Sequence, residues 1–322
     1  TVELGVCADP ATLISAIQGS GSASPVEGDD HVVEAIVSAS FANLSGFFIQ
    51  EEAADMDADS QTSEGLFVYY TGTLPEVGSI VRVLGKVEER FEKTQLSASE
   101  APLVCGSDVV VATSFSLPFA NALVPESLEG MLVSASSELV VTDNYSLGRY
   151  GEVVLAPERL FVPTNLYVAG SPEAIALAAN NALSKITLDD GMNGSNPEPV
   201  IYPTGELSAA NTLRGGDTVS SLTGVMDFSF NLYRIIPTEA PTFAATNPRT
   251  VEPELTQGNL KVASLNVLNL FNGDGQGAGF PTARGASTAA ELERQMAKTV
   301  AALAAMDADI VGLMEIENDG FT

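Results

Sequence analysis

The chain has 322 residues, of which 45% are hydrophobic, and its formal net charge is −28. This hydrophobic fraction excludes a largely disordered protein, and the length predicts two or three domains. The negative charge excludes a basic protein that wraps DNA, but it does not exclude an enzyme that binds a phosphodiester briefly through metal ions. No apolar run reaches the roughly 18 residues of a membrane span, because Asp307 and Asp309 interrupt the best candidate, 300–314.

The start of the chain and its two cysteines favour a secreted or cell-surface protein. Neither Met nor a hydrophobic leader precedes Thr1, as in a secreted protein after signal removal, although recombinant expression also produces such a start. Cys7 and Cys105 are expected to form one disulfide, and the alternative is two buried thiols. Closing a loop of nearly a hundred residues is worth roughly 4 to 5 kcal/mol in the chain-entropy model.

Residues 28–113 carry the pattern of a small closed β-barrel. They follow an N-terminal arm over 1–27, and the Gly- and Ser-rich stretch 19–30 reads as a linker. Five short antiparallel strands with little helix are typical of an OB-like barrel. The expected strands, each β-branched or aromatic and bounded by turn residues, are 31–41, 46–52, 64–70, 79–91 and 93–99.

Residues 124–245 repeat this order of segments and predict a second OB-like barrel. The long strand of each barrel has a glycine in its middle, Gly85 and Gly224, which marks a bend or bulge. The segments that correspond to the first, second and third strands and to the last hairpin of the first barrel are 127–137, 137–147, 151–158 and 216–237.

The second barrel also contains an insertion. Ser171 is placed as an N-cap and Pro172 lies in the first helical turn, so 171–184 is predicted to be a helix. The following segment, 186–208, reads as a long loop.

Residues 255–322 have a different pattern, that of an α/β domain. An apolar strand at 260–271 is followed by a glycine-rich loop, a helix and a second apolar strand that ends in acids. Thr288 and Glu291 have capping-box spacing at the start of the helix. One such unit cannot bury its own sheet, so it is expected to be the first part of a larger domain. The whole chain is therefore predicted to be mainly β, with two OB-like barrels before the start of an α/β sandwich.

The sequence of this last part carries a recognisable signature in SLNVLNLFNG, PTARGAS and ERQMAKTVAALAAMDADIVGLMEIENDG. It resembles the start of the endonuclease/exonuclease/phosphatase (DNase-like) fold. More narrowly, the chain is similar to large extracellular nucleases of bacteria, in which an OB-like region precedes the catalytic domain. TSEGLFVYY, VTDNYSLGRYGEV and LSAANTLRGGDTV also resemble that family. The resemblance implies a secreted, metal-dependent nuclease that hydrolyses phosphodiester bonds of extracellular DNA.

Two residues match site positions of this family. Asn266 matches the Asn that ends the first strand near the phosphate and metal, and Glu315 matches the Glu that holds the divalent cation. The residue pattern agrees, because a carboxylate after an apolar strand lies at the edge where open α/β folds place their sites. Mg²⁺, or Mn²⁺ in its place, needs only one or two carboxylates beside waters and phosphate. The alternatives are a solvated acid at Glu315 and a turn residue at Asn266.

The chain departs from the family in its histidines. The family uses His residues as general base and phosphate contact, and these follow downstream of the matched part. The chain has one His, His31, in a predicted strand of the first barrel. The expectation is therefore that the C-terminal catalytic part of the protein is missing and that this fragment alone is inactive.

The acidic run at Asp55, Asp57 and Asp59 starts like a calcium loop, although its sixth and twelfth positions are not Gly and Glu. A Ca²⁺ site in a hairpin loop is one interpretation, and a solvated acidic loop is the other. Asp189 and Asp190 are a weaker candidate of the same kind.

Arg82, Lys86 and Arg90 are spaced by four in one predicted strand. The period of two puts them on one face, and OB-like barrels bind oligonucleotides or sugars on a strand face beside aromatic rings. They are candidates for a nucleic-acid surface, and the alternative is an ordinary polar strand face.

The sequence thus predicts a secreted nuclease fragment, with DNA as substrate and no partner protein. The first alternative is a non-catalytic surface module whose barrels bind nucleic acid or polysaccharide. The second is a phosphoesterase of the same fold that acts on another phosphodiester.

Overall fold

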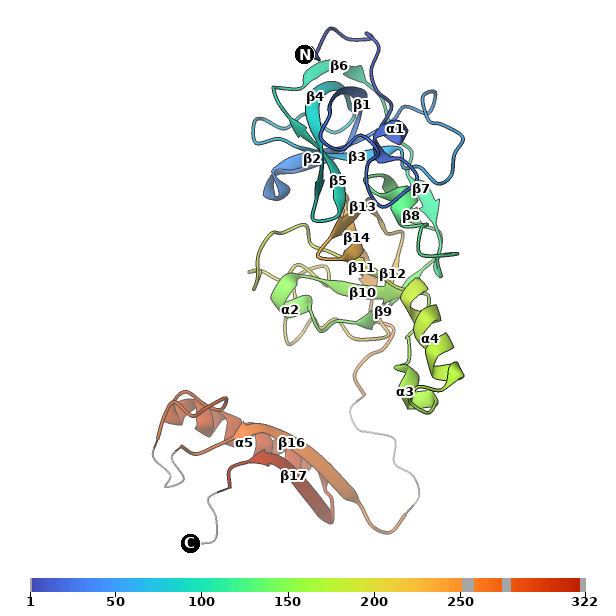
Figure 1. Ribbon diagram of the computed structural model, residues 1–322. Helices are drawn as coiled ribbons and strands as arrows, with labels where there is room; N and C mark the ends of the chain where they lie inside the picture. Colours follow the sequence, from blue (N-terminus) through green and yellow to red (C-terminus); the bar gives the residue numbers. More distant parts are fainter. Residues whose placement is uncertain (1, 251–257, 274–278, 319–322) are drawn as a thin grey trace. The chain divides into compact units, whose positions relative to one another are not determined.

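The protein is described by a computed structural model that covers residues 2–250, 258–273 and 279–318. Contacts divide the chain into two compact units, Thr1–Arg249 and Thr250–Thr322. The expected start of the last domain, at 255, lies outside the described residues. Strands dominate the first unit, and a strand–helix–strand element forms the described part of the second (Figure 1). The predicted mainly-β class is confirmed.

The first sheet closes into a five-stranded barrel. The strand order is β1-β2-β3-β5-β4, and β1 also pairs with β4. Neighbours are antiparallel except β3 and β5, which are parallel. This is the OB-like topology that the sequence predicts. The strands are β1 (Asp30–Phe41), β2 (Gly46–Gln50), β3 (Gly65–Tyr69), β4 (Ser79–Arg90), β5 (Lys93–Ala98) and, outside the ring on β4, β6 (Leu103–Ser107).

Apolar side chains at alternate positions of these strands point inward and form the core of the barrel. In β4, Val81, Val83 and Val87 are fully buried, and Phe47 of β2 and Leu96 of β5 belong to the same core. The arm over 1–27 also contributes to this core, which the sequence does not predict. Its helix α1 (Ile14–Gln18) places Ile14 and Ile17 among these side chains, both with no exposed surface.

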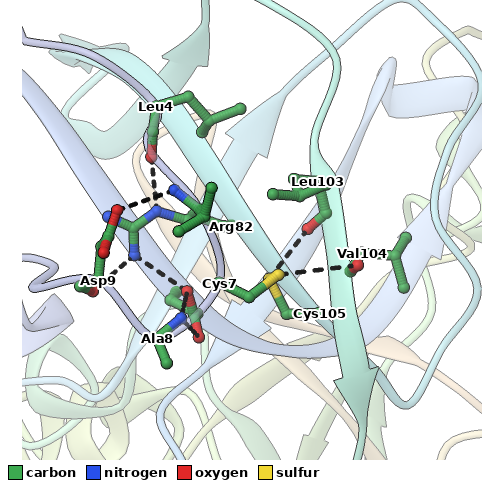
Figure 2. Close-up of a disulfide and its surroundings, with 10 residues drawn as sticks. Leu4, Cys7, Ala8, Asp9, Arg82, Leu103, Val104 and Cys105 are labelled. Carbon is green, nitrogen blue, oxygen red and sulfur yellow. Dashed lines mark hydrogen bonds and ion pairs between the residues drawn. A yellow bond between two sulfur atoms is a disulfide. The ribbon is translucent and has the colours of Figure 1, made fainter.

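The arm over 1–27 is bound to the outside of the barrel near β4 and β6 by a disulfide and by hydrogen bonds. Cys7 and Cys105 form the expected disulfide. Figure 2 shows Arg82 of β4 beside it, reaching the carbonyl oxygens of the arm. Its guanidinium donates to the backbone oxygens of Leu4 at 2.6 Å and Asp9 at 2.8 Å. A buried arginine therefore orders a segment that has little regular structure of its own.

The second barrel lies in a nine-stranded sheet and repeats the pairing of the first. Around it, β10, β11, β14 and β13 occur in that order, with β11 and β14 parallel. β9 pairs with β10, and β8 pairs with β13. The strands of this sheet are β7 (Thr113–Phe115), β8 (Leu132–Ala135), β9 (Leu139–Asp143), β10 (Val153–Ala156), β11 (Ile186–Leu188), β12 (Thr218–Ser220), β13 (Thr223–Ser229), β14 (Leu232–Pro237) and β15 (Thr242–Ala244).

This pairing corrects the predicted equivalence of the strands. In the first barrel one long strand, β1, pairs with β4 through its first half and with β2 through its second. In the second barrel β8 and β9 divide these two roles, so together they are the first strand. β10 is then the second strand and β11 the third. The segments 137–147 and 151–158 therefore belong one strand earlier than predicted, and the predicted loop over 186–208 begins with a strand.

The insertion lies between the second and third strands. It contains α3 (Pro163–Leu166) and α4 (Pro172–Leu183), which lie side by side (Figure 1). The side chain of Ser171 accepts a hydrogen bond from the backbone N–H of Ala174 at 3.2 Å, which confirms the predicted N-cap. The remaining short helices of unit 1 are α2 (Leu147–Tyr150) and the 3₁₀ turns Ala42–Leu44 and Glu126–Leu128.

The two barrels share a small apolar junction. Phe48 and Phe67 of the first barrel pack with Val225 of the second. Lys93 pairs with Asp227 at 2.8 Å, and both side chains are mostly buried. Asp227 comes from β13 and Lys93 from the start of β5, so the ion pair joins the last hairpins of both barrels.

Unit 2 contains the predicted strand–helix–strand element. Strands β16 (Val262–Leu270) and β17 (Ile310–Ile316) are parallel, and α5 (Ala289–Met306) connects them. Thr288 is confirmed as the N-cap, because its hydroxyl accepts from the N–H of Glu291. The Glu291 carboxylate accepts from the N–H of Ser287, one residue before the cap, so the return bond of the predicted capping box is shifted by one residue. Part of the glycine-rich loop, 274–278, lies outside the described residues. None of the described helices is long and apolar enough to cross a membrane.

Gly85 and Gly224 occupy equivalent positions, each paired with the last residue of the following strand, Ala98 or Pro237. A Cβ would lie 2.6 Å from the carbonyl oxygen of Ser97 at the first position. At the second it would lie 2.4 Å from the carbonyl oxygen of Ile236. The strands approach too closely here for a side chain.

We therefore expect Gly85→Ala to lower the free energy of unfolding by about 2 kcal/mol, because two paired strands must separate. Urea unfolding measures this change. Gly21→Ala is the control, since no atom lies within 4 Å of the Cβ that it adds. Equal stability of the two variants would contradict the close-approach argument.

Candidate functional site

Asn266 and Glu315 lie at the same end of the two parallel strands of unit 2. Asn266 is in register with Met314, the residue before Glu315. Both residues are exposed. The parallel register therefore brings the two sequence-predicted residues to one edge of the sheet, the carboxyl edge of β17, where open α/β folds present functional groups.

The backbone at this edge departs from regular strand geometry. Leu268, Asn269 and Glu315 have φ of 60°, 50° and 61°, which is the left-handed region. This region is costly for a branched residue such as Leu268. The register between the strands shifts after Asn266 and resumes at Leu270. The irregular segment turns backbone N–H groups toward the side chains of the site.

Three side chains hold this geometry. Asn266 Oδ1 accepts from the N–H of Leu268 at 2.8 Å, and Glu315 Oε2 accepts from the N–H of Asn269 at 3.2 Å. Gln295 of α5 donates to the carbonyl oxygens of Val267 and Leu268 at 2.9 and 2.6 Å. The sequence places Gln295 on or beside the helix face near this edge, together with Arg294 and Lys298, and favours a plain surface role over a phosphate contact. The structure instead gives Gln295 two hydrogen bonds to the backbone of β16.

The residues at this edge can supply part of the ligand set of a hard cation. Glu315 offers a carboxylate and Asn266 an amide, and Mg²⁺ accepts such a small set when waters and phosphate complete it. Glu317 follows, but its Oε2 accepts from the N–H of Asn272 at 2.6 Å. Among the described residues of unit 2, no group of three acidic, His or Cys side chains converges on one point.

In the first barrel a different group of acids converges. One carboxylate oxygen from each of Glu51, Glu52 and Asp55 lies within 4.8 Å of the others. Asp55 thus keeps its predicted place in an acidic cluster, but Asp57 and Asp59 lie outside this group. Their carboxylates accept N–H groups of their own loop, from Asp59 at 2.7 Å and Gln61 at 3.0 Å, in the manner of Asx turns.

Burial raises the pKa of Glu51 in this cluster to about 8, and the neighbouring carboxylates add to the increase. Its Oε1 accepts the N–H of Ile14, the first residue of α1, at 2.6 Å. At neutral pH without a cation the group is therefore mainly protonated.

This raised pKa predicts a pH-dependent difference between the protein and its Glu51→Gln variant. The folded pKa lies above the unfolded value of 4.5, so ionisation progressively destabilises the fold from about pH 4.5 to about pH 8. In EDTA, we expect equal unfolding free energies at pH 4. At pH 9 the variant is expected to be more stable by roughly 1 to 3 kcal/mol. Chemical denaturation at both pH values checks this, and parallel pH profiles would contradict it.

The predicted nucleic-acid surface needs a correction at Arg82. This side chain is 2% exposed and pairs with Glu34 at 2.9 Å beneath the arm. The alternation rule places it correctly on the outer face, but the arm covers that face. Lys86 and Arg90 are exposed on the same strand, and the Arg90 guanidinium lies 5.4 Å from the ring centre of Phe91.

Removing Arg82 should therefore affect stability rather than nucleic-acid binding. We expect Arg82→Ala to cost about 3 kcal/mol in unfolding free energy, because Glu34 loses its ion pair and the arm loses its donors. Lys86→Ala, on the same strand face but exposed, should change it by less than about 0.5 kcal/mol. Thermal and urea unfolding distinguish the two, and similar stabilities would show that the arm is not held by Arg82.

Comparisons with known proteins give one match. A family model described as a domain of unknown function (DUF8508) matches residues 118–249, the region of the second barrel. The searches of curated proteins and of solved structures return no match.

Proposed function

We propose that this chain is the N-terminal part of a secreted, divalent-cation-dependent nuclease that hydrolyses phosphodiester bonds in extracellular DNA. The observation that carries the proposal is the parallel register of β16 and β17, which places Asn266 beside Met314, the residue before Glu315, at one edge of the sheet. The resemblance of residues 260–320 to DNase-like enzymes supplies the reaction class. In this proposal Glu315 would hold Mg²⁺ or Mn²⁺, and the cation would supply stabilisation of the charge on the scissile phosphate.

Each residue at the edge has a defined part in this proposal. Glu315 would hold the cation through its carboxylate, whose Oε2 accepts from the N–H of Asn269. Asn266 donates from its amide to a phosphate oxygen. Gln295 acts through the backbone of β16 as a positioning residue.

The proposal assigns the general base to a later part of the same protein. The one histidine, His31, belongs to β1, where its Nδ1 lies 3.0 Å from the Thr12 hydroxyl. Several apolar side chains of unit 2 are exposed, including Val262, Ile310 and Ile316. They would pack against further elements of the α/β sandwich. Secretion is consistent with the disulfide, and Ca²⁺ at Glu51, Glu52 and Asp55 is a second proposed cation.

Plasmid digestion by the uninterrupted gene product tests the proposal. We expect degradation with Mg²⁺ and Ca²⁺, none with EDTA, and a loss of at least about a hundredfold in Glu315→Gln, which keeps the size of the side chain but removes its charge. Glu317→Gln at the same strand end is the matched control and should retain activity.

Intact plasmid with folded protein in every lane would reject the DNase. The alternatives are then a non-catalytic binding module or a phosphoesterase of the same fold, and hydrolysis of bis(p-nitrophenyl) phosphate separates them. Equal activity of Glu315→Gln and Glu317→Gln would show that Glu315 does not hold the catalytic cation.

A further inference from the structure

A cavity of about 470 Å³ lies at one end of the second barrel. Its walls come from the β9–β10 connection, the β13–β14 turn and the segment after β11. When β8 and β9 count as the first strand of the barrel, the β9–β10 connection joins its first and second strands. The β13–β14 turn then joins the fourth and fifth strands, and the segment after β11 follows the third. OB-like barrels bind oligonucleotides and oligosaccharides at these places. The volume is that of a ligand site.

The base of the cavity is a buried charged group. Arg234 of β14 is 2% exposed and pairs with Glu152 at 2.9 Å and with Asp189. Its Nη2 donates to the carbonyl oxygen of Ser229 at 2.8 Å. Its Nε is buried and has no acceptor among the described residues. A buried donor without a partner is costly. An oxygen atom of a bound ligand would supply the acceptor that Nε lacks.

The rim of the cavity carries exposed rings. Tyr150 is 41% exposed and Phe230 is 78% exposed. Phe230 has φ of 52° in a two-residue turn, a position that normally takes Asn, Asp or Gly. The Phe230 ring lies 5.4 Å from the guanidinium carbon of Arg234. Most of its surface stays exposed, so its free face is available to a ligand.

The charges at the cavity decide between the two ligand classes of OB-like barrels. Glu152 and Asp189 contribute two carboxylates against the one cation of Arg234, so a phosphodiester would meet net negative charge. A neutral polyhydroxylated ring fits better. Carboxylates accept from hydroxyls, and Arg234 and Asn193, which also lines the cavity, donate. The apolar C–H face of such a ring can pack on Tyr150 or Phe230.

We propose that this cavity binds one unit of a neutral oligosaccharide. Tyr150 and Phe230 contact the ring face, while the carboxylates and Arg234 hydrogen-bond the hydroxyls. This binding is independent of the proposed nuclease activity, because every residue involved belongs to the second barrel.

Isothermal titration of the full chain with neutral hexasaccharides tests the proposal. The probes are β-1,4- and α-1,4-linked glucose, β-1,4-linked N-acetylglucosamine and β-1,4-linked mannose hexamers, beside a twelve-residue oligothymidylate. We expect micromolar to millimolar binding of at least one hexasaccharide and none of the oligothymidylate. No saccharide binding overturns the proposal, and binding of oligothymidylate alone assigns the cavity to nucleic acid.

Variants locate the binding. Tyr150→Ala and Phe230→Ala should each weaken saccharide binding by about tenfold. Phe91→Ala is the matched control, because Phe91 is 75% exposed in the equivalent turn of the first barrel and also has positive φ. Tyr145→Ala is a second control from the same connection as Tyr150, outside the lining. Controls should stay within about twofold. Unchanged binding in both cavity variants, with circular dichroism showing folded protein, overturns the proposal.

Discussion

The first 249 residues depend on a contact in which two backbones touch directly. A Cβ on Gly65 would lie 2.2 Å from the backbone carbon of Gly130, and one on Gly130 would lie 2.6 Å from that of Gly65. Gly130 also needs its φ of 74°. Around this contact, Gln50 accepts from Leu132 at 2.8 Å and Ser63 donates to the Glu129 carbonyl. Because these two glycines have no side chains, the barrels approach closely at this point. The apolar contact of Phe48 and Phe67 with Val225 and the ion pair of Lys93 with Asp227 form the rest of the junction.

The scarcity of cations gives each buried one a structural role. The chain has 14 Lys and Arg residues against 42 acids. Arg82 orders the arm, Lys93 joins the barrels and Arg234 forms the base of the cavity. Several acids are also buried, and burial raises the pKa of Glu129 at the junction well above its ordinary value. Lys86 and Arg90, by contrast, are cations of the first barrel that stay exposed.

Periodicity predicts this fold where patterns are local, and fails where distant segments meet. The alternation of Val81, Val83 and Val87 identifies the inner face of β4, and spacing identifies the caps at Ser171 and Thr288. It cannot show that β8 and β9 are one divided strand, because a bend and a turn both interrupt alternation. The resemblance indicates Asn266 and Glu315, but the cover over Arg82 is made by backbone carbonyls, which have no sequence signature.

The disulfide also determines how the chain carries mechanical tension. Cys7 and Cys105 are 98 positions apart and include between them every strand of the closed first barrel. A pulling force applied beyond these two residues passes through the covalent bridge and bypasses β1 to β5. Reduction would add that whole length to the stretched chain. Under oxidising conditions the second barrel and unit 2 are therefore the parts that extend under load, while the first barrel stays mechanically shielded.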